Sequence, residues 1–370
     1  MLPNQPNSRL VVLAVLLAVV TGLVIAPVGG VAAQEDMACE YPIEVEDATG
    51  TTITIDEPPE DIVVLHAGSA QIVHDLDAWD RVSGAPVTPF TAYLENHDAP
   101  TDVTDDEGFP IQEEIVDLEP DLVLVGHLGD PANVEMLRDQ GLTVYMGPTP
   151  TSVDDIQNKV LRYGELIGAC QEASDEVAWM DERLEAVDEL TEDIEEPLVY
   201  YELGDGWTFG EGTFQADMIE RAGAENLGTS AGLDGWGTVS TETVVDMDPD
   251  WILYGDSFEE PPISEPIEET TAVHSDNVLA VNANYMSQSG PRVVLAIEEM
   301  AEAFAESAET DDDAVSEEAD DEEPTDTTAD DTADDTEDQE ITADDDGLPG
   351  FGIVAALAAV VLTMLLRRSP

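Results

Sequence analysis

The chain has 370 residues, of which 85 are Asp or Glu and only 10 are Lys or Arg, so its formal net charge at pH 7 is −75. A chain this acidic has no electrostatic means of holding a nucleic acid or an anionic membrane surface, and both are excluded as partners. The single lysine, Lys159, and the many carboxylates are similar to the composition of proteins from extreme halophiles, where molar salt screens repulsion over roughly 3 Å.

The N-terminus has the features of a secretory signal peptide. An apolar run from Leu10 to Ile25 is followed by small residues that fit a cleavage site. We therefore expect a signal peptide at 1–33 and an N-terminal extension at 34–60. A lipoprotein that begins at Cys39 is the alternative, although this cysteine lies well beyond the apolar run.

From residue 61 the chain alternates short apolar runs with helical patterns. The runs "DIVVLH", "PDLVLVG" and "LTVYMG" predict buried strands, and "SAQIVHDLDAWD" and "NVEMLRDQG" between them predict helices. Strand and helix in alternation indicate parallel βαβ units. We therefore predict an N-terminal α/β lobe at 61–150.

Residues 151–196 are predicted to form connecting helices. Apolar residues recur there at spacings of three and four, first from Val153 to Ile167 and again from Val177 to Val187. The alternation then restarts with "LVYYELG", "ADMIERAG", "ETVVDM", "PDWILYG" and "NVLAVNA", which predicts a C-terminal α/β lobe at 197–305. The predicted fold class is α/β, with two Rossmann-like lobes joined by a connecting helix.

The sequence contains one internal repeat. The segments "EEIVDLEPDLVLVG" at 113–126 and "ETVVDMDPDWILYG" at 242–255 share seven identical positions at a constant offset of 129 residues. We interpret this repeat as one helix-Pro-Asp-strand unit that each lobe uses once.

The C-terminal region reads as a tether followed by an anchor. Residues 306–346 contain 22 acidic residues, no basic ones and no apolar periodicity, which predicts a disordered tether. In 347–370 the apolar stretch has fourteen residues, short of the roughly 20 that span a bilayer. Pro349, Gly350 and Phe351 resemble the PGF-type sorting signal of haloarchaeal surface proteins. An uncleaved, tilted membrane helix is the alternative, and both place the body on the extracellular face, anchored at the C-terminus.

The chain has two cysteines, Cys39 and Cys170. In an exported protein an even pair indicates one disulfide, here between the N-terminal extension and the connecting helices.

Five segments, in order, carry a family resemblance. These are "IVVLHAGSAQIVHDLDAWDRVSGAP", "EEIVDLEPDLVLV", "MIERAGAENLG", "WGTVSTETVVDMDPDWIL" and "NVLAVNANYMSQSGPRVVLAIEEMAEAF". They are similar to the signature segments of ABC-transporter substrate-binding proteins for vitamin B12, ferric siderophores and haem. The resemblance implies two lobes with little hinge motion, a cleft between them for one large metal chelate, and a permease dimer with ATPase subunits as partner.

The resemblance also implies a set of ligand-binding residues in loops at the C-terminal ends of strands, where open α/β sheets generally place their ligands. Trp207 and Trp236 are each flanked by glycine and offer flat apolar faces, although both rings could instead pin loops to the lobe surface. The predicted set is His66, Ser69, Tyr93, His127, Trp207, Phe209, Trp236, Asn284, Tyr285 and Gln288.

Two of these positions depart from the family pattern. Asn284 and Gln288 align where a vitamin B12-binding member has an acidic and a basic residue, so cobalamin, ferric siderophore and haem all remain open as ligands. His66 and His127 are candidates to ligate the metal of the chelate, and hydrogen-bonded loop histidines are the alternative. The other histidines do not add up to a bare-metal site.

Glu113 and Glu242 begin the two copies of the repeat and align with family positions that dock onto the permease, one in each lobe. Helix chemistry is the alternative, because a carboxylate in the first turn favours the helix dipole. It does not require the same residue at the same step in both lobes.

Catalysis has little support. The sequence has no G-x-S-x-G, H-E-x-x-H or P-loop motif, and we expect neither an enzyme nor a bound cofactor. A surface-anchored adhesion or enzymatic module on the same scaffold is the alternative function, since fold does not fix function.

Overall fold

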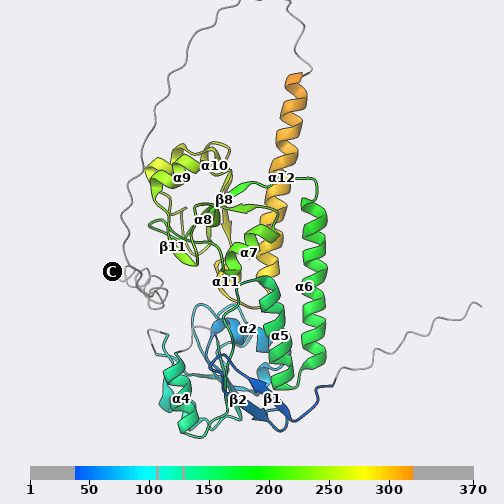
Figure 1. Ribbon diagram of the computed structural model, residues 1–370, viewed down its shortest axis with the longest axis vertical. Helices are drawn as coiled ribbons and strands as arrows, with labels where there is room; N and C mark the ends of the chain where they lie inside the picture. Colours follow the sequence, from blue (N-terminus) through cyan, green and yellow to red (C-terminus); the bar gives the residue numbers. More distant parts are fainter. Residues whose placement is uncertain (1–37, 106–107, 127–129, 320–370) are drawn as a thin grey trace, which may run out of the picture. The chain divides into compact units, whose positions relative to one another are not determined.

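The computed structural model describes residues 38–105, 108–126 and 130–319 (Figure 1). The predicted signal peptide, His127 and the predicted sorting signal therefore lie outside the described residues.

A β-hairpin precedes the first lobe. Strands β1 (Ile43–Glu46) and β2 (Thr52–Ile55) pair antiparallel, and alternate residues of the hairpin are buried in the same core as the N-terminal sheet. The buried carboxylate of Asp47 accepts a hydrogen bond from Nη2 of Arg138 at 2.5 Å. This ion pair ties the hairpin to the N-terminal lobe.

The N-terminal lobe contains a five-stranded parallel sheet in the order β5-β4-β3-β6-β7. Its strands are β3 (Ile62–Val64), β4 (Val82–Ala85), β5 (Thr101–Asp102), β6 (Leu122–Val125) and β7 (Val144–Met146). Its helices are α2 (Ala67–Asp75), η1 (Trp79–Arg81), α3 (Gln112–Asp117) and α4 (Pro131–Asp139). Alternate residues of β6 pack in two separate cores, one shared with α2 and the other with α3 and α4. Both faces are therefore covered, which explains why the strands are continuous apolar runs.

The connecting segment consists of two long helices, α5 (Val153–Ile167) and α6 (Cys170–Thr191), which pack side by side (Figure 1). The side chain of Ser152 caps the first turn of α5, and Gly168 ends it in a left-handed conformation with φ 77°. A Cβ atom at Gly168 would lie 2.9 Å from Cβ of Pro58, so only glycine fits this turn. The long C-terminal helix α12 (Val293–Ala319) packs along α6.

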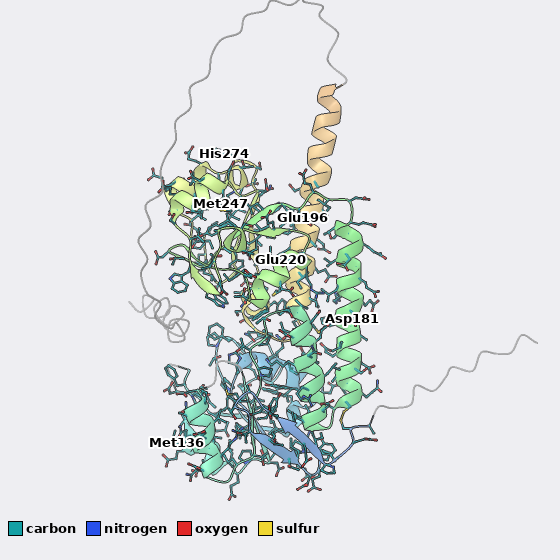
Figure 2. The ribbon with its side chains drawn as sticks, in the orientation of Figure 1. Met136, Asp181, Glu196, Glu220, Met247 and His274 are labelled. Carbon is teal, nitrogen blue, oxygen red and sulfur yellow. A yellow bond between two sulfur atoms is a disulfide. The ribbon has the colours of Figure 1, made fainter. Side chains whose placement is uncertain are left out.

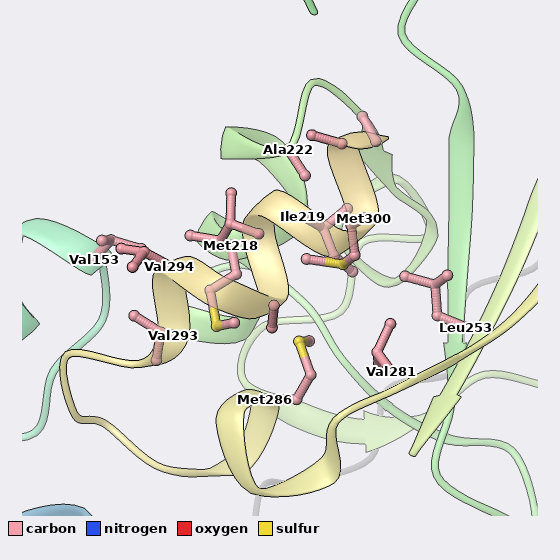
Figure 3. Packing of buried hydrophobic residues seen from close by; sticks show 14 of the residues in the cluster. Val153, Met218, Ile219, Ala222, Leu253, Val281, Met286, Val293, Val294 and Met300 are labelled. Atoms are coloured by element: carbon pink, nitrogen blue, oxygen red, sulfur yellow. The ribbon is translucent and has the colours of Figure 1, made fainter. Parts of the chain in front are cut away.

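The C-terminal lobe contains a four-stranded parallel sheet in the order β10-β8-β12-β13 and a two-stranded ribbon of β9 and β11. The strands are β8 (Leu198–Glu202), β9 (Trp207–Phe209), β10 (Glu225–Asn226), β11 (Trp236–Thr238), β12 (Trp251–Gly255) and β13 (Val278–Val281). The helices are α7 (Phe214–Arg221), α8 (Leu227–Ser230), α9 (Thr241–Met247), η2 (Glu265–Glu269), α10 (Thr271–His274) and α11 (Ala283–Ser287). Figure 3 shows the largest core, where Val293, Val294 and Met300 of α12 pack near Met218 of α7 and Leu253 of β12.

The predicted fold class is confirmed, because each lobe contains its own parallel sheet. The repeat is also explained: its two copies form α3 with β6 and α9 with β12. In the first copy Asp121 accepts the backbone N–H groups of Glu60 and Asp61 at 2.9 and 3.0 Å, just before β3. In the second copy Asp250 accepts that of Leu198, at the start of β8, at 2.8 Å. The repeated aspartate therefore anchors the neighbouring strand in both lobes.

Two further sequence expectations can be compared with the structure. The disulfide is confirmed, because Cys39 and Cys170 are bonded. The tether differs, since α12 continues to Ala319 and enters the segment predicted to be disordered from residue 306. A helix that is already formed and packed propagates through residues with high helix propensity such as Ala and Glu. Within the ranges that the structure describes, no helix is long and apolar enough to cross a membrane.

Candidate functional site

The two lobes meet through a series of hydrogen bonds that includes three predicted ligand residues, Tyr93, Gln288 and Asn284. Tyr93 of the N-terminal lobe donates its hydroxyl hydrogen to Oε1 of Gln288 in the C-terminal lobe, at 2.9 Å. The same hydroxyl accepts a hydrogen bond from Nε2 of Gln71 on α2, at 2.5 Å. Burial raises the pKa of Tyr93 to about 12, so its hydroxyl stays protonated at neutral pH.

Gln288 has two more partners. Its Nε2 donates to the backbone oxygen of Phe90 at 2.7 Å and to Oδ1 of Asn284 at 3.2 Å. The ring of Tyr285, also on α11, meets the ring of Tyr93 edge to face with centroids 6.1 Å apart. The loop before Leu94 and the short helix α11 therefore form one joint surface from both lobes.

The segment that follows α11 is held closely by the N-terminal lobe and α5. A Cβ at Gly290 would lie 2.2 Å from Oε1 of Gln71, and one at Gly68 would lie 3.2 Å from the backbone nitrogen of Ser289. Nζ of Lys159, on α5, donates to the backbone oxygen and to Oγ of Ser289 at 2.9 and 3.0 Å. These contacts leave no room for larger residues and fix the segment between three elements.

The positive charges of this junction are already engaged. Arg292 makes a two-pronged ion pair with Asp75 at the end of α2, and its guanidinium lies 5.4 Å from the centroid of the Tyr93 ring. Burial lowers the pKa of Lys159 to about 7. Burial, together with the charge of Asp75, raises the pKa of the nearby Glu176 to about 7.

His66 lies at the end of β3, where it is the N-cap residue of α2. Burial and the charge of Lys159 lower its pKa to about 4, so the imidazole is neutral at pH 7. Its ring lies directly against Gly126 at the end of β6, where a Cβ would come within 2.8 Å of Cβ and Cγ of His66. Across the described ranges, no group of three or more His, Cys, Asp or Glu side chains could hold a metal ion.

The two predicted tryptophans lie on neighbouring strands of the C-terminal lobe. Trp207 begins β9 and Trp236 begins β11, and both are half-buried. The turn before Trp207 is folded around the buried carboxylate of Glu202, whose Oε1 accepts the backbone N–H groups of Gly204 and Gly206 at 2.6 and 3.1 Å. Burial raises the pKa of Glu202.

Three of the predicted ligand residues are buried in the structure. Ser69 is buried and its hydroxyl lies 2.9 Å from that of Tyr163, so it holds α2 to α5. Phe209 is 1% exposed and supports Trp236 from behind, with ring centroids 5.4 Å apart. Gln288 is 3% exposed and contacts protein on all its polar atoms. Sequence indicates that a residue follows a strand but not which way its side chain points, because one step along a strand reverses the face.

Several residues of the junction were absent from the predicted set, namely Gln71, Asp75, Lys159 and Arg292. A signal for Lys159 was present, because it lies three residues after Ile156 and four before Tyr163, on the buried face of α5. A lysine on an apolar helical stripe, in a chain with no other lysine, indicates a buried role.

The predicted docking residues are on the surface. Glu113 and Glu242 lie in the first turns of α3 and α9 and are exposed, and neither side chain has an ion-pair partner within the described residues. Ser240 caps α9 by accepting the N–H of Thr243 at 3.1 Å, so the N-terminus of this helix is already capped without Glu242. A groove of about 270 Å³ lies beside Glu113 and extends to Met136. Figure 2 labels Met136, which lies on α4.

Comparison with known proteins identifies the class. The chain matches the model of the periplasmic binding protein family over residues 62–285 and belongs to this family, whose members bind rather than transform their ligands. A "Cobalamin-binding protein" of Halobacterium salinarum is 35% identical over 75% of this chain and 80% of its own length. An uncharacterised ABC transporter substrate-binding lipoprotein of Bacillus subtilis is 28% identical over 79% of this chain and 95% of its own.

Solved structures share the fold. The periplasmic haem-binding protein RhuT of Roseiflexus matches with a TM-score of 0.58 and 23% identity, over 67% of this chain and 99% of its own. The periplasmic vitamin B12-binding protein BtuF of Vibrio cholerae matches with a TM-score of 0.58 and 21% identity, over 68% of this chain and 98% of its own. At these identities the likeness concerns the fold alone.

Proposed function

We propose that this protein captures a corrinoid outside the cell and delivers it to an ABC importer. The observation that carries the proposal is the junction itself, where Tyr93, in the segment after β4, bonds to Gln288, in the segment after β13. Open α/β sheets bind ligands at the C-terminal ends of their strands. The relative from Halobacterium salinarum, named for cobalamin, supports the same ligand class.

The charges of the junction favour a corrinoid over the other two chelate classes. Haem carries two propionates, and many siderophores bind iron through anionic groups, so both favour a site with available cations. Here Arg292 is paired with Asp75, and Lys159 is bonded to Ser289. The half-buried Asn284, held by a hydrogen bond from Gln288, instead offers a neutral amide, which suits the carboxamides on the rim of a corrinoid.

A titration tests this function. The purified protein, in molar KCl, is titrated with cyanocobalamin, haemin and a ferric hydroxamate siderophore while tryptophan fluorescence is followed. We expect saturable one-to-one quenching of the tryptophan fluorescence by cyanocobalamin. The ligand-dependent change in fluorescence should be smaller in Trp236→Phe and in Trp207→Phe than in the wild type. Trp179→Phe on α6 is the matched control and should retain the full ligand-dependent change. Saturable binding of haemin alone would replace the corrinoid, and no binding of any probe would contradict the function.

The remaining parts of the proposal concern delivery. A permease dimer with its ATPase subunits is the expected partner, and the exposed Glu113 and Glu242 are the proposed docking residues. The C-terminal segment, with Pro349, Gly350 and Phe351, is proposed to anchor the protein on the extracellular face of the membrane. Both follow from the positions of these residues in the chain, and docking is tested below.

A further inference from the structure

The hydrogen-bond chain at the lobe junction has a fixed direction. It begins at the backbone N–H of Arg292, which can only donate and which bonds to Oε1 of Gln71 at 3.1 Å. The amide of Gln71 must therefore turn Nε2 toward Tyr93, and the tyrosine hydroxyl then has its own hydrogen left for Oε1 of Gln288.

The other end of the chain is fixed independently. The backbone oxygen of Phe90 can only accept, so Gln288 must turn Nε2 toward it. This agrees with the orientation that Tyr93 requires. Two backbone groups with opposite and unchangeable roles thus determine both amide orientations.

The orientation of Gln288 in turn fixes the orientation of the Asn284 side-chain amide. The second hydrogen on Nε2 of Gln288 points to Asn284, whose Oδ1 accepts it at 3.2 Å. Its Nδ2 therefore faces the other way, and it has no hydrogen-bond partner within the described part of the chain. Asn284 is half-buried, beside the Tyr93 and Tyr285 rings that join the lobes. Asn284 is therefore the last residue of this series of hydrogen bonds, and its free side-chain group is a donor.

We propose that Asn284 is a specificity-determining residue whose side-chain N–H groups bind an uncharged carbonyl oxygen on the ligand, and that Gln288 is the positioning residue that fixes this polarity. This rests on the proposed function as a binding protein and adds which ligand atom is recognised. The oxygen is uncharged because the cations of the junction, Arg292 and Lys159, are already bonded to Asp75 and Ser289.

Two uncharged corrinoid probes distinguish a donor from an acceptor at this position. Dicyanocobinamide carries primary carboxamides, which can donate or accept, whereas the heptamethyl ester of dicyanocobyrinic acid carries carbonyls that only accept. Wild-type protein should bind both. In Asn284→Asp one carboxylate oxygen still accepts from Gln288 and the other replaces Nδ2. The carboxamide can rotate to donate to it, but the ester cannot, so the ester should lose about tenfold or more in affinity relative to the amide.

Gln288→Glu reaches the same result without changing Asn284. One carboxylate oxygen would accept from Tyr93, and the other would lose the donation to Phe90 and accept from Asn284, so the asparagine amide would rotate and present Oδ1 instead of Nδ2. We expect the same selective loss of the ester, which a merely structural role of Gln288 would not produce. Ser287→Asp is the control, because it adds the same charge on α11 at an exposed position outside the chain of hydrogen bonds.

The outcomes test the role of Asn284 separately from the corrinoid function. An unchanged ester-to-amide ratio in Asn284→Asp overturns the proposal, and so does an equal loss of both probes. A ratio shift of equal size in Ser287→Asp also overturns it, because charge alone would then be the cause. Wild-type protein that binds neither probe overturns both this proposal and the corrinoid function. If Gln288→Glu does not fold, Asn284→Asp alone decides.

Discussion

Arg292 donates two hydrogen bonds to Asp75, from Nε at 3.0 Å and from Nη2 at 2.6 Å. The pair joins the residue before α12 to the last residue of α2, and so connects the two lobes at a second point beside the Tyr93–Gln288 bond. The side chains are 23% and 9% exposed, so water screens the pair only partly. In a chain with so few cations, this contact is a specific use of one of them.

Asp75→Asn should therefore destabilise the protein. The substitution keeps the shape but removes the charge opposite Arg292, and we expect a loss of about 2 kcal/mol in the free energy of unfolding. Thermal unfolding in molar KCl measures it. Glu165→Gln is the matched control, because it removes the exposed pair with Arg162 on α5 and should cost less than about 0.5 kcal/mol. Equal effects of the two changes would contradict a special role for the Asp75 pair.

The same corner predicts a pH dependence. The pKa of Glu176 is raised to about 7 from an ordinary value of 4.5, because burial and the charge of Asp75 disfavour its ionised form. An acid with a raised folded pKa contributes most stability below its unfolded pKa, and this contribution is lost as pH rises from about 4.5 to about 7.

Glu176→Gln should remove this dependence. The variant should be more stable than the wild type at pH 8, by less than about 1 kcal/mol since the side chain is partly exposed and screened. The advantage should shrink as pH falls to 5. Glu172→Gln, at an exposed position on the same helix, should show no such trend. Melting temperatures at both pH values check the sign, and a larger advantage at pH 5 would refute the assignment.

The sequence predicted the lobes well because each depends on a strong local signal. The apolar runs that became β6 and β12 are buried on both faces, and the stripe of α5 has a clear helical period. The junction was harder to predict because it depends on long-range partners. Gln71 and Arg292 are 221 positions apart, and no local pattern relates them. Phe209 and Trp236 are both aromatic residues next to a glycine in the sequence, yet Phe209 is buried in the core and Trp236 is only half-buried.

The disulfide supplies a further prediction. Cys39 and Cys170 are 131 residues apart, and closing a loop of this length in the unfolded chain is worth roughly 4–5 kcal/mol in the chain-entropy model. The double change to serine should lower the free energy of unfolding by about this amount, or less if the unfolded chain is compact. Peptide mapping without reductant tests the bond itself, and recovery of both residues as free thiols would disprove it.

The glycine that ends each copy of the repeat has a packing role. A Cβ at Gly126 would meet His66 at 2.8 Å, and one at Gly255 would meet Cβ of Ala283 at 3.0 Å. Gly126→Ala should therefore cost about 1–3 kcal/mol through overpacking. Gly147→Ala is the control in the same lobe, because its nearest neighbour would lie 3.8 Å away. Chemical unfolding of the two variants compares them, and equal stability would show that His66 moves aside freely.

The repeated glutamate lacks the structural role that two other shared residues of the repeat have. Asp121 and Asp250 anchor neighbouring strands, and the terminal glycines allow close packing. Glu113 and Glu242 contact nothing of this kind, although both lie exposed in the first turn of a helix. A partner built from two like subunits needs matching contacts from each lobe, which accounts for the same residue at the same step.

Changing Glu113 and Glu242 together to Gln should leave the melting temperature and the affinity for cyanocobalamin nearly unchanged. Uptake of labelled cobalamin by cells that carry only the variant should be abolished, and each single change should give a partial loss. Because exposed ion pairs are heavily screened in molar salt, we expect direct hydrogen bonds to the permease rather than long-range attraction to provide the contact. Glu114→Gln is the control in the same turn of α3. Normal uptake by the double variant would leave the repeated glutamate with no role beyond the shared ancestry of the two lobes.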